Sequence, residues 1–191
     1  MMKKVDYKAY FSKSIDFETY LKNMEAEIGL GIVNDHSQYV PQNLQRVKRI
    51  GKTIKLHPEI VAAAEGLKQK IHWLVITEHW CGDAAQLVPI MNAIAEKSSG
   101  NIDFRLIYRD ENPDLIAAHL TNGTLSIPIL LQLDENFELL KSWGPRPQSC
   151  VDYVEELKKV PNYQVDIKEK LQKWYSDDKG NAAQNELLTL L

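Results

Sequence analysis

Cysteine is scarce in this chain of 191 residues, which contains only Cys81 and Cys150. Two cysteines cannot build a disulfide-rich scaffold, and they do not provide the four ligands of a structural zinc site. Each cysteine is therefore expected to be either a reactive thiol or a buried packing residue. We expect neither a metal ion nor a cofactor.

Long apolar runs and a strong net charge are also missing. No apolar stretch reaches the length of a membrane span, and charged residues interrupt the sequence that follows Met1-Met2-Lys3-Lys4. We therefore expect a cytoplasmic protein that has no secretory leader and no membrane partner. The net charge of -3 gives no general attraction to nucleic acid, so we expect no nucleic-acid partner.

The composition that is present is that of an ordinary globular protein, with 44% hydrophobic and 26% charged residues. Apolar residues at helical spacing predict one helix over residues 16–29, behind Asp16 as N-cap, and another over 41–51. A third helix is expected to begin at His57-Pro58. The leucine-rich tail, 187–191, is expected to pack on its own domain rather than to form a dimer contact.

From residue 72 the pattern alternates between strands and helices. Trp73-Leu74-Val75-Ile76 is a continuous apolar run, which is typical of a strand that is buried on both faces. The order strand, helix, strand that follows implies a parallel pair of strands. The remaining predicted elements are a helix over 82–97, a strand over 102–108, a helix over 113–120, a hairpin of strands 129–133 and 137–143, a helix over 149–159, and another near 167–174.

Cys81 lies where the buried strand passes into the helix over 82–97. The free amide N–H groups at a helix start favour a thiolate, which is the nucleophile in disulfide exchange. Asp83 opposes this effect, but we expect it to be solvated and screened. We therefore expect a thiol pKa below that of a free cysteine, and the alternative is a buried, inert cysteine.

The motif Trp80-Cys81-Gly82-Asp83-Ala84 resembles the Trp-Cys-Gly-Pro-Cys motif of thioredoxins, and Pro89 matches the proline that bends their active-site helix. Three further segments resemble the family in the same order. They are Asp110-Glu111-Asn112-Pro113, the cis-proline segment Ser126-Ile127-Pro128, and Gly144 at the end of the hairpin. The resemblance implies an α/β thioredoxin fold, which is a central mixed sheet with helices on both faces.

The resemblance covers residues 53–160, which we assign to a thioredoxin-like domain. Residues 1–52 are assigned to a helical N-terminal extension, and residues 161–191 to a C-terminal helical extension. Two departures from the family matter. Ala84 replaces the resolving cysteine, and Val75 replaces a buried acid, so an external thiol must resolve any adduct on Cys81.

The resemblance implies two functions. The first is a monothiol oxidoreductase, in which Cys81 exchanges with the disulfide or thiol of a protein or of a small molecule. The second is a non-catalytic module that keeps only the peptide-docking groove. A third function, an iron–sulfur cluster shared between subunits, lacks support because only one suitable ligand is present.

Several residues beside Cys81 are candidates for roles in the site. The implied substrate surface consists of Trp80, Gly82, Asp83, Ile127, Pro128 and Gly144. Groups that could tune the thiolate are Arg109, Arg146 and His79, although each arginine could instead pair with a nearby carboxylate. Cys150 is expected to be a packing residue rather than a displaced resolving thiol.

Overall fold

The computed structural model describes residues 5–31 and 34–191. Its centre is a mixed sheet with the strand order β2-β1-β3-β4. The central strands β1 and β3 are buried along their whole length, which explains the continuous apolar run in β1. β1 is parallel to β2, whereas β3 is antiparallel to both β1 and β4. The strands are β1 (Ile71–Thr77), β2 (Ile102–Tyr108), β3 (Ile129–Leu133) and β4 (Leu139–Trp143).

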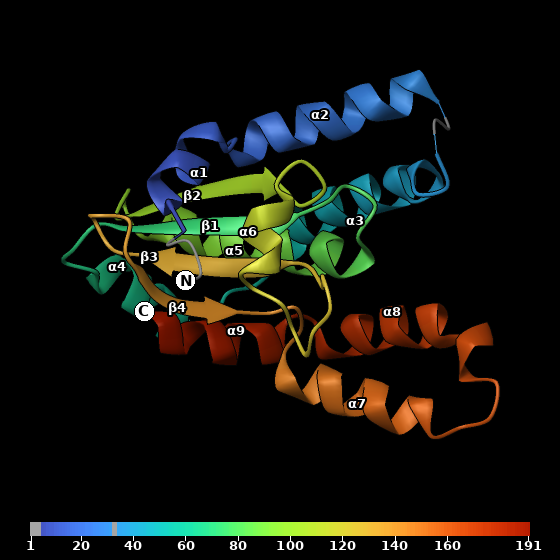
Figure 1. Ribbon diagram of the computed structural model, residues 1–191. Coiled ribbons are helices and arrows are strands. Elements are labelled where there is room, and N and C mark those ends of the chain that lie inside the picture. Colours follow the sequence, from blue (N-terminus) through green and yellow to red (C-terminus); the bar gives the residue numbers. More distant parts are fainter. Residues whose placement is uncertain (1–4, 32–33) are drawn as a thin grey trace.

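Helices surround this sheet. They are α1 (Tyr7–Lys13), α2 (Phe17–Leu30), α3 (Val40–Thr53), α4 (Pro58–Gly66), α5 (Gly82–Lys97), α6 (Pro113–Ala117), α7 (Gln148–Lys158), α8 (Ile167–Asp178) and α9 (Asn181–Leu187). Three short 3-10 helices are η1 (Ser37–Tyr39), η2 (Tyr163–Val165) and η3 (Leu188–Leu190). Figure 1 shows α2 along the β2 side of the sheet and α9 along the β4 side. The architecture is the predicted α/β fold with additional helices.

Helix α5 is the central helix of the molecule and carries the motif residues. It packs against α3, α4 and β2, and most of its side chains are buried. Cys81 is its N-cap residue, and Pro89 lies inside it. Since α5 begins directly after the loop that leaves β1, the end of the central strand fixes the position of the Cys81 sulfur.

A short N-terminal segment covers the outer edge of β2. The Ile15 N–H donates to the Leu106 carbonyl at 2.9 Å, and the Leu106 N–H donates to the Ile15 carbonyl at 2.8 Å. These two bonds form one antiparallel bridge, which joins the segment between α1 and α2 to β2. The edge strand β2 therefore has a backbone partner on its outer side.

The structure bears out most predicted elements and corrects some of their ends. Helix α1 has no counterpart in the sequence prediction, and α6 ends at Ala117 rather than at residue 120. β4 begins at Leu139 because Phe137, with φ of 63°, lies in the turn. The leucine tail packs on its own domain as predicted, since Leu187 and Leu190 are buried.

The predicted three-part division of the chain is less sharp in three dimensions. Helix α9 packs against α4 and α5, so the C-terminal helices share the core of the sheet domain. No helix within residues 5–31 and 34–191 has both the length and the apolar character that a membrane span requires. The prediction of a missing leader concerns Met1 to Lys4, which lie outside the described residues.

Candidate functional site

Cys81 is buried at the start of α5, with only 7% of its surface exposed. Its Sγ accepts a hydrogen bond from the Ala84 N–H at 3.4 Å, as a helix N-cap does. The S–H group donates to the Ile127 carbonyl oxygen, also at 3.4 Å. The thiol therefore joins the helix start to the segment before Pro128.

Burial, and after it the charge of Asp83, raise the pKa of the Cys81 thiol to about 12. The amides of Ala84 and Asp83 and the charge of Arg146 act in the opposite direction but are outweighed. The prediction of a lowered pKa is therefore wrong. It assumed a partly exposed sulfur, whereas removal from water penalises the thiolate more than the helix amides stabilise it.

Asp83 is buried, whereas the sequence analysis predicts a solvated carboxylate. Its carboxylate is the central group of a polar cluster with Arg146 and Tyr175. The Arg146 guanidinium donates to Asp83 Oδ2 through Nη2 at 2.6 Å and through Nε at 2.9 Å. The Tyr175 hydroxyl donates to Asp83 Oδ1 at 2.8 Å. Arg146 follows β4 and Tyr175 belongs to α8, so Asp83 connects α5 to both segments.

Trp80 and Arg109 form one wall beside the cysteine. The Arg109 guanidinium carbon lies 4.8 Å from the centre of the Trp80 ring, and the His36 ring stacks on Trp80 at 4.5 Å. Arg109 also pairs with Asp110 at 2.7 Å and donates to the Leu125 carbonyl at 3.2 Å. Arg109 therefore pairs with a nearby carboxylate, which is one of the two roles that the sequence predicts for it.

An open groove of about 420 Å³ lies in front of the cysteine. Its lining includes Trp80, Cys81, Asp83, Arg109, Ile127 and Arg146. The Ile127–Pro128 peptide bond is cis, and Pro128 is itself buried. The fold thus brings together residues from four segments that are far apart in the sequence.

Gly82 and Gly144 lie behind this groove rather than in its lining. Gly82 lies under α8, where an added Cβ would be 3.2 Å from Gln172 Nε2. Gly144 has φ of 122°, and a Cβ there would collide with the carbonyl oxygen of Pro128. Gly144 therefore allows the chain after β4 to approach the cis-proline segment closely.

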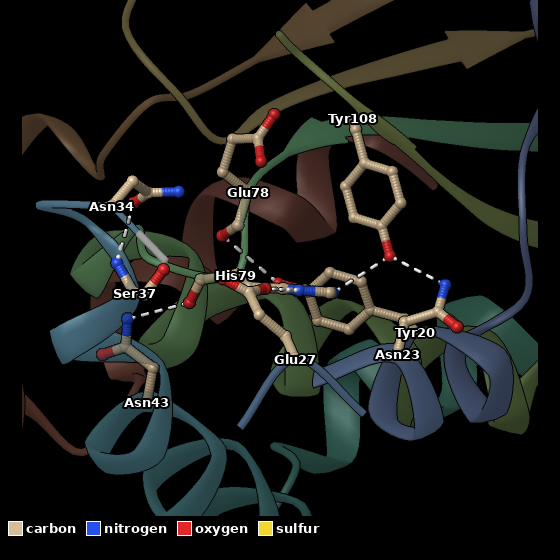
Figure 2. Close-up of polar contacts among 9 residues, drawn as sticks. All are labelled: Tyr20, Asn23, Glu27, Asn34, Ser37, Asn43, Glu78, His79 and Tyr108. Carbon is tan, nitrogen blue, oxygen red and sulfur yellow. Dashed lines mark hydrogen bonds and ion pairs between the residues drawn. The ribbon is translucent and has the colours of Figure 1, made fainter. Parts of the chain in front are cut away.

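His79 is buried in a separate polar network that reaches α2, as Figure 2 shows. Its Nδ1–H donates to the Glu27 carboxylate at 2.6 Å, and its Nε2 accepts from the Tyr108 hydroxyl at 2.9 Å. The Asn23 amide donates to the same hydroxyl at 3.0 Å. Both ring nitrogens are thereby occupied, and no hydrogen bond joins this ring to Cys81 in the described part of the chain.

The same network holds the backbone of the loop before the cysteine (Figure 2). The Asn43 side-chain amide donates to the His79 carbonyl at 3.0 Å, and the Tyr20 hydroxyl donates to the Glu78 carbonyl at 3.4 Å. Burial lowers the pKa of His79, which keeps the ring neutral at neutral pH. The contacts thus give His79 a structural role between α2 and the loop.

Two residues of this region have no signal in the sequence analysis. Burial raises the pKa of Glu78 to about 7, and this side chain accepts the Asp110 N–H at 2.9 Å. Tyr175 is 92 residues from Asp83 in the sequence, so no local pattern could connect the two. Its place three positions before Cys81, the N-cap residue of α5, is the signal that could have drawn attention to Glu78.

Cys150 is fully buried in α7, and both cysteines are free thiols. Burial raises the pKa of Cys150 to about 12, which is consistent with a packing residue. Within residues 5–31 and 34–191, no group of three or more His, Cys, Asp or Glu side chains could hold a metal ion.

A mixed sheet, a cysteine at the start of its central helix and a cis-proline opposite that cysteine define a thioredoxin-fold protein. A family model described as Thioredoxin matches residues 33–158, about two thirds of the chain. The chain therefore belongs to this thioredoxin family.

Solved structures show the same fold. A protein of unknown function, PA1234 from Pseudomonas aeruginosa, is similar with a TM-score of 0.69 and 20% identity, over 97% of this chain and 96% of that one. An HIV 4E10 epitope-scaffold is similar with a TM-score of 0.67 and 21% identity, over the same shares of 97% and 96%. A search of the curated proteins gives no significant match.

Proposed function

We propose that this protein is a non-catalytic thioredoxin-fold module that binds an extended peptide segment in the groove beside Cys81. The observation that carries the proposal is the contrast between the thiol and the groove. The Cys81 sulfur is buried, and its pKa is raised to about 12, whereas the groove in front of it is open. A buried, protonated thiol is a poor nucleophile, but it does not hinder binding.

The composition of the groove supports an extended peptide as the ligand. Leu125 is 51% exposed at the groove, where it can contact an apolar side chain. In the described residues, the Ile127 N–H donates no hydrogen bond to protein, so it can pair with a peptide carbonyl. Trp80 adds an aromatic surface that is held in place by Arg109 and His36.

A second candidate function is monothiol exchange with a protein or low-molecular-weight disulfide. The observation that favours it is the Ala84 N–H, which already points at the Cys81 sulfur and would stabilise a thiolate. Exchange would require the sulfur to leave its contact with the Ile127 carbonyl and become accessible. The reactivity of Cys81 therefore separates the two functions.

The alkylation rate of Cys81 should report an unreactive thiol. The measurement uses iodoacetamide across pH 6 to 11 on a Cys150→Ala variant, so that only Cys81 is followed. We expect an apparent pKa above that of a free cysteine, about 8.5, and slow alkylation at neutral pH, because ionisation in the buried site is unfavourable. An apparent pKa below that of a free cysteine would favour monothiol exchange and contradict the proposal.

Peptide binding itself should be independent of the thiol. Binders are selected from a cysteine-free random peptide library, and their affinities are compared between wild type and Cys81→Ser. We expect similar affinities, because Cys81 lines the groove with only 7% of its surface exposed. Leu125→Asp should weaken binding about tenfold or more, since it places a charge against the apolar ligand surface.

The control for Leu125→Asp is Leu120→Asp. Leu120 is exposed to a similar extent, 45% against 51%, but it does not line the groove. The control should bind as wild type does. Equal effects of the two substitutions, or a failure to select any binder, would count against the groove as a peptide site.

A further inference from the structure

A second pocket lies away from the cysteine, at the junction of α3, α4, α5 and the turn between α8 and α9. Its volume is about 630 Å³, which is within the range of small-molecule sites. It shares no lining residue with the groove beside Cys81. The pocket is therefore a separate site from the groove proposed to bind a peptide.

The floor of this pocket is apolar. Ile50 of α3 and Leu87 and Ile90 of α5 are buried residues that line it. Gly180 lies beside them with φ of 82°, and a Cβ there would be only 2.7 Å from Ile90 Cδ1. The turn between α8 and α9 can therefore approach α5 this closely only with glycine.

The rim of the pocket is cationic. Arg49, Lys55 and Lys179 line it, and none of the three forms an ion pair within the described residues. Among the described lining residues the only carboxylate is that of Asp178, and both of its oxygens accept the Ala182 N–H at 3.2 Å. The carboxylate is thus turned to the backbone of α9, and the three cations are left for an anionic ligand.

We propose that this pocket binds a small anionic amphiphile, with a carboxylate or phosphate head and a short apolar chain. The head would lie among Arg49, Lys55 and Lys179, since unpaired cations attract and hydrogen-bond such oxygens. The chain would cover the apolar floor, because that contact removes apolar surface from water. A head group without the chain would contact only the cationic rim, and a chain without the head group would contact only the apolar floor.

Calorimetry with four probes tests this inference on the full chain. The probes are octanoate, octyl phosphate, octanol and inorganic phosphate. We expect at least one of the two amphiphiles to bind at least tenfold more tightly than octanol and than inorganic phosphate. The comparison of octanoate with octyl phosphate identifies the preferred head. Octanol binding as tightly as both amphiphiles, or binding by none of the four, would overturn the inference.

A matched pair of variants on α3 locates the binding. Arg49→Gln removes a cation of the rim, whereas Lys52→Gln removes one equivalent charge from the same helix outside the pocket. We expect Arg49→Gln to weaken amphiphile binding about three- to tenfold and Lys52→Gln to leave it unchanged. Equal affinities of the two variants, or an amide resonance of Gly180 that does not shift on titration, would place the ligand elsewhere and overturn the inference.

Discussion

Replacing Arg146 with Met should lower the free energy of unfolding by about 3 kcal/mol, because it leaves the buried carboxylate of Asp83 without its cation. The side chain of Asp83 is only 10% exposed, and Arg146 provides two of its three hydrogen bonds. The remaining donor is the Tyr175 hydroxyl. Urea denaturation followed by circular dichroism measures the effect.

The matched control is Arg109→Met, which breaks the ion pair with Asp110 and also removes the contacts of Arg109 with the Trp80 ring and the Leu125 carbonyl. That carboxylate is 57% exposed, so water replaces the lost partner and we expect a change below about 1 kcal/mol. The double variant Asp83→Asn with Arg146→Met should recover part of the loss, since it removes the buried charge. Equal losses for the Arg146 and Arg109 variants would contradict the role assigned to the Asp83 cluster.

Gly144→Ala should destabilise the protein by about 3 kcal/mol or more. A φ of 122° is unfavourable for any residue with a Cβ, and the added methyl group would collide with the Pro128 carbonyl. The strand end and the cis-proline segment would have to separate. Thermal unfolding measures the loss, and peptide binding in the groove should weaken in the same variant because the adjoining lining residues Ile127 and Arg146 would move.

Gly51→Ala is the opposite control. Gly51 lies inside α3, and nothing lies within 4 Å of a Cβ added there. Alanine is the better helix former, so we expect a gain of about 0.5 to 1 kcal/mol. A Gly144→Ala variant as stable as Gly51→Ala would show that the backbone after β4 adjusts at little cost, which contradicts the close approach described above.

The sequence was sufficient to predict the fold, because its signals are local. The buried run in β1, the helix behind Cys81 and the hairpin of β3 and β4 each follow from residues within one segment. The start of β4 is predicted too early because Phe137 has a left-handed conformation, which an aromatic residue rarely adopts. Helix α1 was missed because its seven residues form a short pattern.

The chemistry of the site could be predicted only in part. The neighbourhood of Cys81 and Ile127 followed from the family resemblance, and the structure joins these two residues by a hydrogen bond. The burial of the sulfur could not be predicted, since it depends on side chains from several segments. The partners of Asp83 and His79 come from α8 and α2, and no local pattern indicates contacts over such separations.

The bridge between Ile15 and Leu106 has a consequence for the behaviour of this protein at high concentration. An uncovered edge strand can recruit a strand from another molecule, and repeated recruitment leads to aggregates. Here the two backbone bonds of Ile15 occupy the middle of the β2 edge. The bridge thereby hinders strand pairing between molecules at the β2 edge, and at the β4 edge Lys141 adds a charge that disfavours such pairing.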